Sequence, residues 1–130
     1  MKKRVLDTCI LIDIWHGQSA SKIRVRSDET ARAAARAWLK LRPNDAILTP
    51  IQLEFIGGTR DKDELRLSEL FLGEFELLDE GKVLVGDWQE AERFARRIKG
   101  EGRARDAVDC LILAICKRLN ADLDTHDTGM

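Results

Sequence analysis

Four acidic residues lie at the edges of the most apolar segments of this 130-residue chain: Asp7, Glu54, Asp109 and Asp127. A lone carboxylate is rarely left among apolar neighbours, because removing its hydration has a high free-energy cost. Four such acids therefore favour one pocket with a shared positive partner. A hard divalent cation, which prefers oxygen ligands, is the simplest partner of this kind.

The segments around these acids alternate between strand and helix patterns. Short apolar strands are expected at Arg4–Leu6, Ala46–Thr49, Lys82–Val85 and Ala121–Thr125. Apolar residues at helical spacing predict helices over Thr8–Trp15, Asp28–Leu41, Pro50–Gly57, Asp61–Leu78, a segment from a capping box at Asp87–Glu90 to Gly100, and Arg105–Leu119. The second half of the Asp61–Leu78 helix could instead form a strand. This alternation predicts a single three-layer α/β/α domain over residues 1–130 with a short parallel sheet.

All four acids are expected at the same edge of that sheet. Asp7 and Asp127 follow the first and last strands, while Glu54 and Asp109 lie near the starts of helices. Sites in open parallel sheets form outside the carboxyl ends of the strands. Two carboxylates about 5 Å apart repel by roughly 3 kcal/mol at an effective dielectric constant near 20. Such a cluster must hold protons or bind cations.

The chemistry of the four acids favours Mg²⁺ or Mn²⁺ over zinc, because no set of Cys or His ligands accompanies them. A metal ion of this kind lowers the pKa of a bound water and neutralises charge on a phosphodiester. The three cysteines are an odd number without zinc-finger spacing, which is typical of a reducing cytoplasm. No stretch of about 18 apolar residues is present, so we expect no membrane span.

Four motifs occur in order along the chain: LDTCILIDIWHG at 6–17, LTPIQLEFIGG at 48–58, RDAVDCLILAI at 105–115 and THD at 125–127. With these motifs the chain resembles the PIN-domain ribonucleases, and specifically the VapC-type toxins of toxin–antitoxin pairs. The resemblance implies a Mg²⁺- or Mn²⁺-dependent endoribonuclease, a hydrolase that is commonly a homodimer. It also implies neutralisation by a VapB-like antitoxin.

The resemblance assigns roles to individual residues. It implies that Asp7, Glu54, Asp109 and Asp127 hold the metal, and that the hydroxyls of Thr8 and Thr125 orient waters or ligands. One departure is Cys9, which stands where the family more often has Asn or Ser.

Arginines near the Asp109 helix are candidates for binding RNA. The net charge of −1 argues against a bulk polyanion binder but leaves room for a local basic patch. Arg103 and Arg105 end a basic stretch that leads into this helix, and we expect them to contact RNA phosphates. The alternative is an ordinary solvated face. Asp106 either adds a metal ligand or only favours the helix N-terminus.

Two other functions fit part of the pattern. The first is a non-catalytic PIN-like module that binds RNA or a protein partner, with Asp7 serving only as a helix cap. The second is hydrolysis of a small phosphorylated molecule, which normally needs a second Asp two residues after a nucleophilic one, where this chain has Cys9. Apolar surface along Trp15, Trp38 and Phe71 would suit a dimer or an antitoxin helix.

Overall fold

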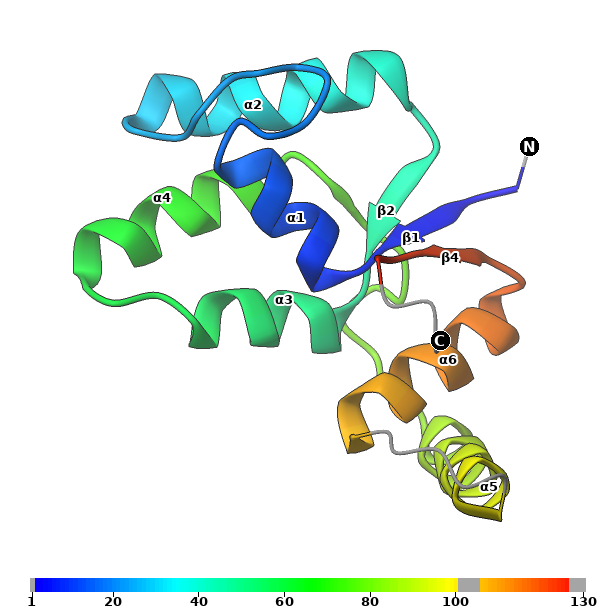
Figure 1. Ribbon diagram of the computed structural model, residues 1–130. Helices are drawn as coiled ribbons and strands as arrows, with labels where there is room; N and C mark the ends of the chain where they lie inside the picture. The colour runs from blue at the N-terminus through cyan, green and yellow to red at the C-terminus, as the bar shows by residue number, and fades with distance from the viewer. Residues whose placement is uncertain (1, 101–105, 127–130) are drawn as a thin grey trace.

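The computed structural model describes residues 2–100 and 106–126. Its elements are β1 (Arg4–Leu6), α1 (Thr8–Trp15), α2 (Asp28–Leu41), β2 (Asp45–Ile47), α3 (Thr49–Gly57), α4 (Lys62–Leu72), β3 (Glu76–Leu77), α5 (Val85–Gly100), α6 (Ala107–Leu119) and β4 (Asp122–Asp124). Figure 1 shows α1 to α4 on one side of the sheet and α5 and α6 on the other. The predicted α/β class with helices on both faces is confirmed.

The sheet is parallel throughout and has the strand order β3-β2-β1-β4. Val5 in β1 pairs with Ala46 on one side and with Leu123 on the other. With partners on both edges and helices on both faces, β1 is the centre of the fold, and Val5 and Leu6 are fully buried. Asp7 therefore emerges at the middle of the carboxyl edge of the sheet.

Aromatic side chains fill the core between α1, α3 and α4. The Trp15 ring lies 5.4 Å from Phe55 and 5.3 Å from Phe71, both edge-on, and Phe71 lies 5.5 Å from Phe75. Phe71 is fully buried, and Trp38 is buried with its Nε1 donating to Asp45 Oδ2 at 2.9 Å. The hypothesis of an apolar docking surface along Trp15, Trp38 and Phe71 is therefore wrong, because these rings are used to build the core.

The third strand differs from its prediction. The apolar run Lys82–Val85 is not a strand; β3 is Glu76–Leu77, in the segment that the alternative for the Asp61–Leu78 helix allowed. A two-residue strand is too short to show an alternating pattern in the sequence. The longer apolar run at 82–85 was therefore mistaken for the third strand. The helix α4 ends at Leu72, where Gly73 forms its C-cap.

The start of α5 also differs from its prediction. The helix begins at Val85 rather than at the expected capping box, so Asp87 lies in its first turn and accepts the Leu84 N–H at 2.8 Å. Leu84, Val85 and Trp88 are exposed there. None of the described helices combines the length and apolar character needed to cross a membrane.

Candidate active site

Asp7 lies between the end of β1 and the first turn of α1. Its Oδ1 accepts the Thr8 backbone N–H at 2.8 Å, which caps the helix, and its Oδ2 accepts the Thr125 hydroxyl at 2.7 Å. The residue is only 8% exposed. Both donors are uncharged, and no lysine or arginine of the described segments forms an ion pair with this carboxylate. Asp7 thus caps α1, and among the described residues its carboxylate has no cationic partner.

Glu54 projects from α3 toward the same point. Its Oε1 accepts the Thr8 hydroxyl at 2.9 Å. Burial raises the pKa of Glu54, the hydrogen bond from Thr8 lowers it, and the negative charges of Asp7 and Asp106 raise it, with a net upward shift. Thr8 therefore joins two acids, one through its backbone N–H and the other through its hydroxyl.

The start of α6 supplies the next acids. Asp106 is the N-cap of α6, and its Oδ1 accepts the backbone N–H of Asp109 at 2.8 Å. Asp109 lies half-buried in the first turn, where the helix dipole favours a negative charge. Asp106 thus stabilises the helix N-terminus, and its negative charge contributes to the raised pKa of Glu54. Arg103, Arg105 and Asp127 lie outside the described residues.

The segment after β4 is held against α1 by a set of polar contacts. Cys9 Sγ lies 3.6 Å from Thr125 Oγ1 and accepts the His126 N–H at 3.3 Å. The His126 Nε2 lies 2.5 Å from Asp13 Oδ2. Cys9 therefore makes polar contacts, and the His126–Asp13 contact was not foreseen, since nothing in the sequence places these two residues together. These contacts position the chain immediately before Asp127.

The chain matches the PIN domain family over residues 4–130. It belongs to that family. PIN domains are generally nucleases that act on nucleic acid and typically bind divalent metal ions. No curated protein gives a significant match. The PIN part of the resemblance is thereby confirmed. The acids at the sheet edge therefore belong to a domain of a nuclease family.

The donor chemistry of this PIN domain fits a hard divalent cation. Asp7 and Glu54 offer carboxylate oxygens, and the upward shift in the pKa of Glu54 comes partly from like charges that a cation would counterbalance. Within residues 2–100 and 106–126, no three acidic, His or Cys side chains are grouped closely enough to hold a metal ion. The four-acid ligand set therefore stays a prediction, with its fourth member outside the described residues.

Proposed function

We propose that this PIN domain is a Mg²⁺- or Mn²⁺-dependent endoribonuclease and the toxin of a toxin–antitoxin pair. One observation carries the proposal: the hydrogen-bond chain from Thr125 to Asp7 and from Thr8 to Glu54, which brings together the ends of two strands and a helix. Such a chain orients acids that are far apart in sequence toward one place. A purely structural role for each acid would not require it.

Different residues would bind the metal, position its ligands and bind the RNA. Asp7, Glu54, Asp109 and Asp127 would hold the metal, which when bound supplies a Lewis acid that activates water and neutralises phosphate charge. The hydroxyls of Thr8 and Thr125 fix the carboxylates of Glu54 and Asp7, as outer hydrogen bonds do for metal-binding groups. Arg103 and Arg105, which precede α6 in the sequence, would contact RNA phosphates.

RNA as the substrate, a VapB-like antitoxin and a homodimer rest on the four sequence motifs, and a cytoplasmic location rests on the number and spacing of the cysteines. The proposal takes residues 1–130 as a single functional domain, and the family match over residues 4–130 supports it. The toxin role makes a cellular prediction. Expression of the chain alone should arrest growth, and the Asp7→Asn variant should not.

The direct test is cleavage of RNA by the purified chain in Mg²⁺ or Mn²⁺, with and without chelator. Asp7→Asn is the decisive variant because Asn caps a helix as well as Asp but brings no charge. Asp122→Asn is the matched control, since Asp122 lies at the amino end of β4 and pairs with Lys2 at 3.0 Å. Equal cleavage by wild type and Asp7→Asn would mean a contaminant or a different site.

A non-catalytic binding module is the second candidate. It is favoured by the capping role of Asp7, which explains that residue without catalysis. RNA binding without cleavage in either metal, unchanged by Asp7→Asn, would support this alternative.

A further inference from the structure

A cavity of about 620 Å³ opens beside Glu54, which is part of its lining. We call it the side cavity. Thr8, Ile12 and Trp15 of α1 line it, together with the loop that carries Arg24 and Arg26, and with Glu54 and Phe55 of α3. The start of α4 closes the opposite wall. Its volume lies within the range of small-molecule sites. The side cavity thus shares Thr8 and Glu54 with the candidate active site.

The charged residues that line the side cavity differ in whether they already have partners. On the α4 wall, Asp61 caps its own helix by accepting the Glu64 N–H at 2.8 Å, and Glu64 pairs with Arg60 at 3.1 Å. On the loop wall, neither Arg24 nor Arg26 has an ion-pair partner in the described part of the chain. Arg24 and Arg26 are therefore the lining arginines outside the ion pairs of the described residues, whereas Asp63 on the α4 wall lies 3.4 Å from Arg66.

The backbone that carries these two arginines is tied down on both sides. His16 and Arg24 form an isolated bridge, and the Val25 N–H donates to the Trp15 carbonyl at 3.0 Å. Gly17, at φ +71°, lies so close to Arg24 that a Cβ there would stand 3.1 Å from the Arg24 nitrogen. The loop is therefore fixed against the end of α1 through backbone contacts.

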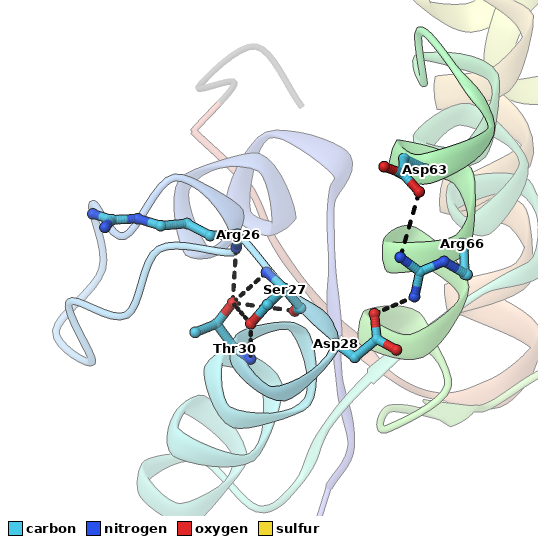
Figure 2. Close-up of polar contacts among 6 residues, drawn as sticks. All are labelled: Arg26, Ser27, Asp28, Thr30, Asp63 and Arg66. Atoms are coloured by element: carbon cyan, nitrogen blue, oxygen red, sulfur yellow. Dashed lines mark hydrogen bonds and ion pairs between the residues drawn. The ribbon is translucent and has the colours of Figure 1, made fainter.

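Figure 2 shows the other anchor, at the start of α2. The backbone N–H groups of Arg26 and Ser27 donate to the Thr30 hydroxyl at 2.7 and 2.8 Å, and Ser27 completes a capping box. Arg66 pairs with Asp28, which ties α2 to α4, and the Arg26 side chain extends away from that pair. The backbone of Arg26 is thus fixed by the Thr30 hydroxyl, and its guanidinium forms no ion pair with Asp28.

Part of the side cavity is apolar, although His16, Thr59 and Asp63 also line it. Ile12, Trp15, Phe55 and Leu67 line it, and Ile12 is 43% exposed. The rings of Trp15 and Phe55 pack edge to face, which fixes the wall they form. Ser68 also lines the cavity, and its fully buried hydroxyl has no hydrogen-bond partner among the described residues.

We propose that the side cavity holds the nucleotide next to the scissile phosphate, with a backbone phosphate on Arg24 and Arg26 and the base against Ile12 and the aromatic wall. The proposal rests on the nuclease function proposed above. Paired arginines suit phosphate oxygens, and a half-apolar wall suits the face of an unpaired base. Arg24 and Arg26 would then determine where the RNA strand lies relative to Glu54.

The first test is RNA binding by the double variant Arg24→Gln/Arg26→Gln. The probe is a short fluorescein-labelled single-stranded RNA, followed by anisotropy over a range of salt concentrations. The cleavage-blocking Asp7→Asn background keeps the probe intact. The magnitude of the slope of log affinity against log salt should fall by about 0.7, since each phosphate neutralised on a single strand contributes about 0.7. The matched control Arg36→Gln/Arg93→Gln removes the same charge outside the cavity and should keep the slope.

The second test is cleavage by the same double variants in the otherwise native chain. Arg24→Gln/Arg26→Gln should raise KM about tenfold or more with little change in kcat, because the acids are untouched. Ile12→Gln should change the distribution of cut sites while keeping the salt slope. Leu41→Gln, at a residue 61% exposed on α2, is its control. Thermal melts by circular dichroism would check that each variant is folded.

The outcomes separate the two proposals. If wild type cuts RNA but the arginine double variant matches its control in slope and KM, the side-cavity inference is wrong and the nuclease function stands. If wild type neither binds nor cuts RNA, both are wrong. If RNA binding is kept and the double variant instead releases a co-expressed product of the neighbouring gene, the cavity takes a protein segment and the inference is wrong.

Discussion

The Thr8 hydroxyl donates a 2.9 Å hydrogen bond to Oε1 of Glu54, 46 residues away in the sequence. The backbone N–H of the same threonine caps α1 by donating to Asp7. One residue therefore sets the spacing between the carboxylate at the end of β1 and the carboxylate on α3. Because the threonine donates to both, it lowers the repulsion between them without neutralising either.

Replacement of Thr8 by Val should weaken metal-dependent cleavage by roughly 10- to 100-fold, the usual effect of losing an outer hydrogen bond at a metal site. Val keeps the shape of Thr and the backbone N–H but cannot donate to Glu54. Thr8→Ser restores the donor and should recover most of the activity. Titration of the initial cleavage rate with Mn²⁺ would measure the effect. Equal rates for Thr8→Val and Thr8→Ser would show that this hydroxyl has no part in the site.

The two roles of Asp7 can be separated by comparing Asn with Ala. Asp7→Asn keeps an N-cap acceptor, whereas Asp7→Ala removes it and should lower the free energy of unfolding by about 1 kcal/mol relative to Asp7→Asn. Both variants should lose cleavage. Urea unfolding in chelator, followed by circular dichroism, would measure the difference. A pair with equal stability would contradict the capping role of Asp7.

The sequence was informative about the acids because their positions follow a rule of the fold. Asp7 directly follows the apolar pair Val5-Leu6, and Glu54 interrupts a run of apolar residues, so both stand out. Parallel strands bring such positions to one edge. The Thr8–Glu54 and Thr125–Asp7 hydrogen bonds needed coordinates, because the partners come from separate elements.

The side cavity could not be predicted in the same way. Its arginines lie in a segment that reads as a polar loop, and only the alternation of Ile23 and Val25 with basic residues hints at an ordered edge. Whether Arg24 and Arg26 have partners depends on the placement of the acids of α4, which no periodicity reveals. β3 was misplaced for a related reason, since two residues are too few to show an alternating pattern.

The ion pair between α5 and α6 predicts a pH dependence of stability. Asp87 is 1% exposed, and Arg118 Nε donates to its Oδ1 at 2.7 Å. Burial raises the pKa of Asp87, but the bonds from Arg118 and the Leu84 N–H outweigh it and lower the pKa. A carboxyl with a lowered folded-state pKa stabilises the fold above its unfolded pKa, about 3.9. That contribution is lost as pH falls through the folded-state value.

Asp87→Asn should therefore cost about 2 kcal/mol at neutral pH, because it leaves a partly buried guanidinium without its partner. The difference from wild type should shrink below pH of about 4, where the wild-type carboxyl also becomes protonated. Urea unfolding across this pH range would measure it. Glu92→Gln, which removes an exposed partner of Arg96 on the same helix, is the control and should change stability little. A constant difference across the pH range would contradict the ionic role of Asp87.

The cysteines should differ in reactivity. Burial raises the pKa of the Cys116 thiol to about 12, and the charges of Asp122 and Asp7 add to the rise. The reactive thiolate is therefore scarce at Cys116, so iodoacetamide at about pH 8 should modify it only when the chain unfolds. Cys9 is half-buried and should be modified first. Peptide mapping by mass spectrometry after timed labelling would give the order.

Modification of Cys9 should also reduce cleavage. Its sulfur lies 3.6 Å from the Thr125 hydroxyl, which in turn donates to Asp7, and it accepts the His126 N–H. An added carbamidomethyl group would separate these partners and displace Thr125 from Asp7. Cys9→Ser, which keeps a small polar acceptor, should stay active and resist inhibition by the reagent. Full activity in a wild-type sample labelled completely at Cys9 would mean that the Thr125–Asp7 bond is not needed for cleavage.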